Sequence, residues 1–192
     1  MFLVTLQKLS KPLSYLTIKH DQKFIVDALL PMLLAALSFF LIVSSKHDFN
    51  IVGDKGLIDH VNGLLQMLVG FFVASLAAVA TFQRPGMDEP MQGIPPTLNG
   101  RGLTRREFLC YMFGYLAFVS IVTYLFSGVV KLSLPALKLT LSSNIYEMTS
   151  QLGLFGYLVV VFNILITTLL ALFFLTDRIV RAEPQAPDIE ED

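Results

Sequence analysis

Charged residues are scarce in this chain, and neither sign of charge dominates. Among its 192 residues, lysine and arginine number 14, and aspartate and glutamate number 15. Charged residues therefore make up 15% of the sequence, whereas a soluble domain carries about 25%. Apolar residues make up 54%, which argues against both an ordinary water-soluble globule and a disordered chain. The net charge of −1 offers no basic face to a nucleic acid, so we expect no direct nucleic-acid binding.

Cysteine is almost absent, and the residues that usually hold metals or carry out catalysis form no familiar pattern. Cys110 is the single cysteine, which excludes an internal disulfide and a cysteine-rich zinc module. Acids and histidines occur together in residues 44–60, but no pair has a helical ligand spacing, so no metal site is expected. The sequence also lacks the zinc-protease, nucleophile-elbow and phosphate-loop motifs. We therefore expect no cofactor and no catalysis by this chain.

The apolar residues gather in four runs, each long enough to cross a bilayer core, which takes about 20 helical residues. These runs cover residues 24–43, 61–82, 108–130 and 152–175. They contain no lysine or arginine, and their only acid is Asp27, near the start of the first run. Because a charge at a helix centre costs about 2.5–3.5 kcal/mol on the insertion scale, such runs are typical of helices in lipid. The sequence predicts an all-α integral membrane protein, with a four-helix transmembrane bundle over residues 24–176.

The basic residues predict the orientation of the bundle. Residues 1–23 hold four lysines, the 83–106 loop holds four arginines, and the 177–192 tail holds two. The two opposite loops hold two lysines each. The positive-inside rule therefore predicts that both termini and the central loop are cytoplasmic.

Each cytoplasmic segment has its own expected structure. In residues 1–23, leucines and Phe2 recur at 4-3-4-3 spacing with lysines between them, which favours an amphipathic segment on the membrane surface. A loosely attached tail is the alternative. The central loop is rich in proline and glycine, which argue against regular secondary structure. It ends in Thr104-Arg105-Arg106-Glu107, which is typical of a capping box at a helix start.

Charges on the central loop and on the tail are candidates for docking a cytoplasmic partner. A helix start with two topology anchors explains the paired arginines, and simple solvation explains the acidic tail, which is expected to be disordered when free. Both segments can also engage a partner of complementary charge. The candidate partner-binding residues are Arg84, Arg101, Arg105, Arg106, Asp188, Glu190, Glu191 and Asp192.

A few polar and small residues inside the spans indicate helix packing. Asn163 and Thr167 are four residues apart and so share one helix face, while Gly70 and Ala74 begin a stripe of small residues. Both patterns favour close contact between helices, within one protomer or between the protomers of a homo-oligomer. The alternative is that Asn163 and Thr167 line a pore.

Asp27 lies four residues after Lys23 and four before Pro31. Proline has no N–H to donate to the Asp27 carbonyl, so a kink is expected here. The favoured interpretation of Asp27 is a hydrated carboxylate at the membrane interface, paired with Lys23. A proton-coupling carboxylate of a small transporter is the alternative. Farther along, residues 131–151 alternate apolar and polar residues, which predicts an extended or interfacial stretch.

The four-span pattern, together with the central loop running into residues 102–111 (GLTRREFLCY), resembles the membrane subunit of the Kiwa anti-phage defence system. The resemblance implies a multi-pass sensor in a bacterial inner membrane. It also implies a homo-oligomer that works with a separate cytoplasmic, DNA-associated effector. It carries over no functional residue. The resulting hypothesis is a non-catalytic sensor and scaffold, with a pore and a transporter using Asp27 as alternatives.

Overall fold

The computed structural model describes residues 10–20, 23–45, 49–81, 83, 87–90 and 95–180. Its elements are η1 (Lys11–Thr17), η2 (Ile25–Leu29), α2 (Leu30–Ser44), α3 (Leu57–Thr81), β1 (Thr97–Leu98), β2 (Arg101–Gly102), α4 (Arg105–Thr140) and α5 (Ser143–Val180). The predicted all-α fold is confirmed, because four long apolar helices pack together. Each of them, with η2 joined to α2, is long and apolar enough to cross a membrane.

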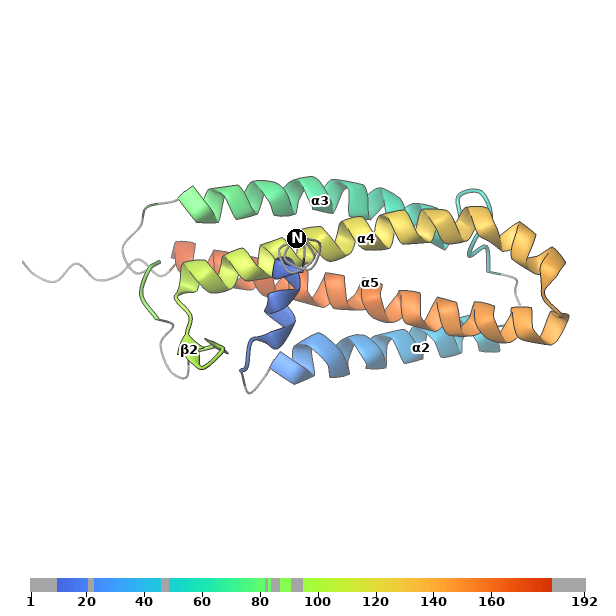
Figure 1. Cartoon of the computed structure of the whole chain (residues 1–192), viewed down its shortest axis with the longest axis horizontal. Coiled ribbons are helices and arrows are strands. Elements are labelled where there is room, and N and C mark those ends of the chain that lie inside the picture. Colours follow the sequence, from blue (N-terminus) through green and yellow to red (C-terminus); the bar gives the residue numbers. More distant parts are fainter. Residues whose placement is uncertain are drawn as a thin grey trace, which may run out of the picture.

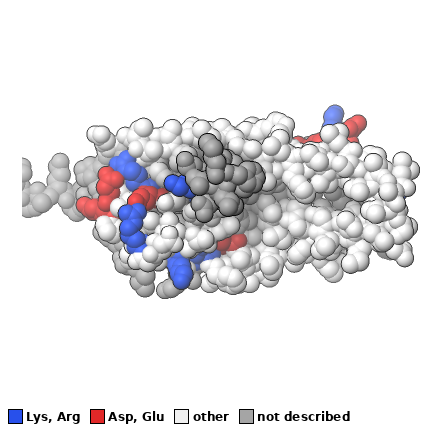
Figure 2. Space-filling model, viewed as in Figure 1, with Lys and Arg blue, Asp and Glu red and all other residues white. Residues whose placement is uncertain are grey.

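The four long helices run antiparallel to their neighbours, but their order in space differs from their order in the chain (Figure 1). α4 and α5 lie at the centre, α3 packs on α4, and α2 packs on α5. Lysines, arginines and acids gather at the end of the bundle where the central loop lies, with one further group at the opposite end (Figure 2). We call the end with the central loop the inner end, and the opposite end the outer end.

Large apolar side chains fill the core and also cover the outside of the bundle. Phe72, Met112, Phe113 and Leu116 are fully buried between the helices. Other apolar side chains, such as Phe126, face outward. A helix that is apolar all round is typical of a membrane span, because lipid rather than water surrounds it.

The prediction of an extended stretch over residues 131–151 is wrong, because the segment is helical. α4 continues to Thr140 and α5 begins at Ser143, so the two helices meet in a tight hairpin. An extended stretch beside lipid would leave its backbone groups unpaired, whereas a helix satisfies them locally. The leucines that alternate along this stretch therefore do not decide its structure. One ion pair joins α4 to α3 at the outer end, where Lys131 Nζ lies 2.6 Å from Asp59 Oδ1.

The described part of the N-terminal segment enters the bundle instead of lying on its surface. η1 is a 3-10 helix that packs on α4, with Tyr15 only 1% exposed and Ile18 also buried. Leu16, which belongs to the predicted apolar stripe, is 51% exposed. Three residues per turn place positions 15 and 18 on one face, so Leu13 of the predicted stripe packs on the core only in part and Leu16 not at all. Residues 1–9 of this segment lie outside the described residues.

The orientation of the bundle can be tested with single cysteines. Cys110→Ser would first remove the native thiol, and a cysteine would then replace exposed Arg101 at the inner end or exposed Ser142 at the outer end. In intact cells, a membrane-impermeant maleimide is expected to label position 142 at once and position 101 only after permeabilisation. The opposite labelling pattern would place the central loop outside the cell.

Candidate functional site

The first turn of the first span is irregular, and a side chain from another helix compensates for it. Pro31 has no N–H, so the carbonyl of Asp27 cannot receive the usual helical hydrogen bond. The chain forms a π turn at Ile25–Leu29. The side-chain amide of Asn163 donates instead to the Asp27 carbonyl oxygen, at 2.7 Å. Asn163 therefore supplies a hydrogen bond to the carbonyl that Pro31 cannot reach.

Asn163 also joins α5 to α4. Its Oδ1 accepts a hydrogen bond from the Tyr115 hydroxyl at 2.7 Å, and the side chain is buried. Thr167, one turn along α5, is fully buried as well, and its Oγ1 has no hydrogen-bond partner among the described residues. Both side chains lie inside a single protomer. The prediction that they serve helix packing, and the alternative that they line a pore, both stay predictions.

The Asp27 carboxylate is the centre of a second set of contacts. Lys23 Nζ forms an ion pair with Asp27 Oδ2, and the Tyr15 hydroxyl donates to Oδ1 at 3.1 Å. Lys23 Nζ also lies 4.2 Å from the centre of the Tyr15 ring, which stacks on Tyr115 with 4.9 Å between ring centres. The expected pairing with Lys23 is confirmed. The expected hydration is not, because the Lys23 and Asp27 side chains are only 12% and 9% exposed.

These contacts join into one cluster, which we call the polar network. It consists of Tyr15, Lys23, Asp27, Tyr115 and Asn163. It connects η1, η2, α4 and α5, elements that are far apart in the sequence. Tyr15 and Tyr115 could not be identified from the sequence, because neither tyrosine belongs to a pattern that marks a functional site.

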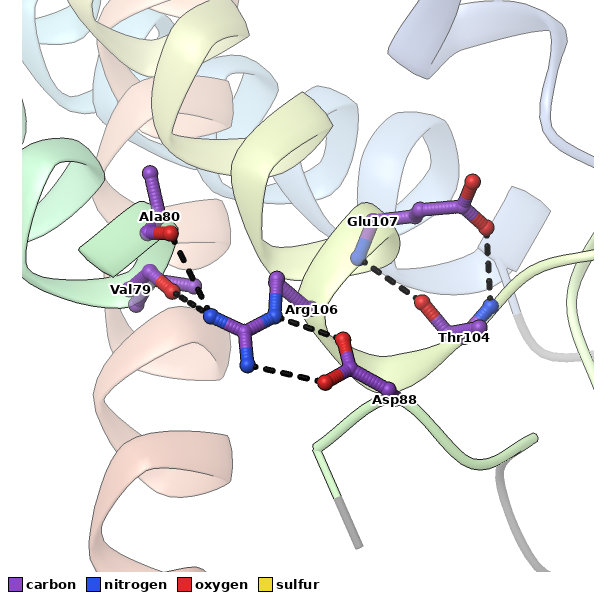
Figure 3. Close-up of polar contacts among 6 residues, drawn as sticks. All are labelled: Val79, Ala80, Asp88, Thr104, Arg106 and Glu107. Carbon is purple, nitrogen blue, oxygen red and sulfur yellow. Dashed lines mark hydrogen bonds and ion pairs between the residues drawn. The ribbon is translucent and has the colours of Figure 1, made fainter. Parts of the chain in front are cut away.

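At the inner end, Arg106 ties the central loop to α3 (Figure 3). Its guanidinium forms a two-point ion pair with Asp88, through Nε to Oδ1 at 2.7 Å and Nη2 to Oδ2 at 3.0 Å. Nη1 also donates to the carbonyl oxygens of Val79 and Ala80, at 3.1 and 3.3 Å. These carbonyls belong to the last turn of α3, where carbonyls lack helical partners and a cation is favoured.

The ion pair lowers the pKa of Asp88 below its usual range, because Arg106 donates hydrogen bonds to the charged carboxylate. A lowered pKa in the folded state means that the pair contributes stability above the ordinary aspartate pKa. That contribution disappears as the pH falls through the lowered value. The Asp88 carboxylate is therefore charged at neutral pH and can pair with Arg106.

The predicted capping box at the start of α4 is confirmed (Figure 3). The backbone N–H of Glu107 donates to Thr104 Oγ1 at 3.3 Å, and the N–H of Thr104 donates to Glu107 Oε2 at 3.1 Å. Arg101 pairs with the other carboxylate oxygen of Glu107. The cap fixes the point where the loop ends and the helix begins.

The central loop contains a short β-hairpin, contrary to the expectation that it has no regular structure. β1 and β2 pair antiparallel around Asn99 and Gly100, both of which have positive φ. An Asn-Gly pair is the preferred sequence for this kind of two-residue turn. The Asn99-Gly100 dipeptide therefore indicates a hairpin turn, although the proline and glycine content of the whole loop argued against regular structure.

The hairpin is also bonded to the N-terminal segment. The N–H of Lys19 donates to the carbonyl of Thr97 at 2.9 Å, and the N–H of Thr97 donates back to Lys19 at 3.1 Å. Two more bonds, from the N–H groups of Arg105 and Arg106 to the carbonyls of Glu89 and Met87, hold the start of the loop. We call this assembly of residues 17–20, 87–90 and 95–107 the inner layer.

The polar network lies deeper in the bundle than the inner layer. Tyr115 is nine residues beyond Arg106 on α4, which corresponds to about 13 Å along a helix. Arg106 marks the inner end of α3, because it caps the carbonyls there. The charged pair at Asp27 is therefore recessed among the helices.

The structure describes three of the predicted partner-binding residues, and their surroundings differ. Arg106 is committed to Asp88 and α3, whereas Arg101 pairs with Glu107 and remains 69% exposed. Arg105 is half-buried. The remaining predicted residues, Arg84, Asp188, Glu190, Glu191 and Asp192, lie outside the described residues.

Gly70 and Ala74 lie outside the core that the structure describes. Both are exposed on α3, and a Cβ added at Gly70 would meet nothing within 4 Å. Their expected role in contacts between protomers stays a prediction. Among the described residues, no group of three histidines, cysteines or acids is placed to hold a metal ion.

Comparison of the chain with models of known protein families, with curated proteins and with solved structures finds no match. Its class therefore follows from the fold alone. Four long apolar helices that pack together define a multi-pass membrane protein.

Proposed function

We propose that this chain is a non-catalytic scaffold and sensor subunit of a bacterial inner membrane, and that it recruits a cytoplasmic effector protein through its inner layer. The observation that carries the proposal is the double backbone hydrogen bond between Lys19 and Thr97. It joins the N-terminal segment and the central loop into one surface. While this pairing is intact, the surface loses less entropy on binding than a free loop does.

The exposed charges on the inner layer have both signs, Arg101 and Asp88 among them, and they favour a protein partner with a complementary pattern of charge. The Arg101 guanidinium is the most exposed of the arginine side chains that form described ion pairs, and it stands next to the hairpin turn. Arg106 contributes by holding the loop rather than by contacting a partner. Rim charges of this kind steer association and select partners.

The exposed small residues of α3 support a homo-oligomer as the form of the scaffold. Gly70 and Ala74 lie on the outside of the bundle, where small residues allow two helices to approach closely in lipid. The resemblance to the Kiwa membrane subunit agrees with an oligomeric scaffold. It also supplies the expected partner, a cytoplasmic effector.

Co-purification tests the recruitment of an effector encoded beside this chain. Replacing residues 85–102 by a glycine-serine linker of equal length is expected to lower recovery of the effector about ten-fold, which corresponds to about 1.4 kcal/mol. Deleting residues 181–192 tests the acidic tail separately. The matched control replaces residues 142–144 at the outer end, which should leave recovery unchanged. Full recovery with both inner-side variants would contradict the proposal.

A further inference from the structure

Residues 10–20 form a segment that is fastened at two separate points, and we call it the strap. At one point Tyr15 is buried in the polar network, where it contacts Asp27 and Tyr115. At the other point Lys19 pairs with Thr97 of the hairpin. The strap therefore links the recessed charges of the bundle to the inner layer.

The strap has little structure that could hold it in place by itself. Its only helix is the seven-residue 3-10 helix η1, and such helices have poor hydrogen-bond geometry. Leu16 and Thr17 point outward, so the strap contacts the bundle through buried Tyr15 and Ile18 and half-buried Leu13. Its position depends on the groups that receive these three side chains.

The groups that receive Tyr15 include a charged pair that is not strongly favoured where it lies. Lys23 and Asp27 are mostly covered, and covering two charges costs desolvation that their attraction only partly offsets. If the two charges were separated and reached by water, both would be hydrated. An open state in which Asp27 and Tyr115 face water would therefore recover part of this cost.

We propose that the strap is a latch with a docked and an undocked position, and that undocking frees Thr97 and so changes the surface that the central loop presents. The polar network holds the docked position. The role of the latch in signalling rests on the proposed function, but the latch itself does not. It is a property of the chain that can be measured without any partner.

A disulfide between the strap and the hairpin measures the docked fraction. Lys19 and Thr97 exchange both backbone hydrogen bonds, and such pairs have Cα atoms about 5.5 Å apart, within the range that a disulfide spans. Lys19→Cys and Thr97→Cys in a Cys110→Ser background are expected to cross-link readily in native membranes under mild oxidation. Adding Asp27→Asn is expected to lower the rate of cross-linking about five-fold.

Two further variants make the experiment specific. Asp59→Asn breaks the Lys131 pair at the outer end and should leave the rate unchanged. Tyr15→Phe keeps the ring stacked but removes the hydroxyl, so it should give an intermediate rate. Equal rates with and without Asp27→Asn would overturn the proposal, as would an equal loss with Asp59→Asn. The effector co-purification uses neither cysteine, so each proposal can fail while the other stands.

Discussion

Replacing Lys23 by methionine is expected to destabilise the bundle by about 3 kcal/mol. Methionine keeps most of the length of the side chain but leaves the Asp27 carboxylate covered and without its cation. It also removes the ammonium group above the Tyr15 ring. Reversible unfolding in mixed detergent and dodecyl sulfate micelles would give the change in the free energy of unfolding.

A second substitution distinguishes the loss of a pair from a loss of packing. Lys23→Met combined with Asp27→Leu removes both charges, so the double variant is expected to regain at least half of the lost stability. Lys131→Met at the outer end breaks a more exposed pair and should cost less than about 1 kcal/mol. A double variant that simply sums the two single losses would show that the charges of Lys23 and Asp27 are not coupled.

Asn163→Leu is expected to cost about 2 kcal/mol, because it leaves two groups without partners inside the bundle. These groups are the Asp27 carbonyl and the Tyr115 hydroxyl. The same unfolding measurement applies. Asn144→Leu, on the exposed outer end of α5, should change the stability by less than about 0.5 kcal/mol.

Tyr115→Phe provides the internal check for Asn163. In the Asn163→Leu background it removes the unpaired hydroxyl, so part of the lost stability should return, whereas Tyr115→Phe alone should be destabilising. A change of less than about 0.5 kcal/mol for Asn163→Leu would mean that water or a rearranged neighbour satisfies the Asp27 carbonyl.

The spans were predictable from the sequence because a charged residue inside a lipid-embedded helix is costly, so each span is a long apolar run. It underestimated the lengths of α4 and α5, since hydropathy reports where lipid lies and not where a helix ends. Lys131 and Ser143 lie beyond the apolar runs, yet both belong to helices. The capping box at Thr104 was predictable because its hydrogen bonds are local.

The polar network was only half predictable. Pro31 predicted that the Asp27 carbonyl would lack its usual helical hydrogen bond. The four-residue spacing between Lys23 and Asp27 predicted the ion pair. The group that satisfies the carbonyl comes from Asn163, which is 136 residues away in the chain. No local pattern specifies such a contact, because it depends on which helices lie side by side.

The arrangement of the helices also has a consequence for how the protein is made. α2 and α3 leave the ribosome first, yet α2 packs on α5 and α3 packs on α4. During synthesis, α2 and α3 therefore lie in the bilayer without their final neighbours until α4 and α5 have been inserted. Ribosome-stalled chains that end before residue 105 should accordingly be open to membrane proteases, and protection should arise only once α4 and then α5 have emerged.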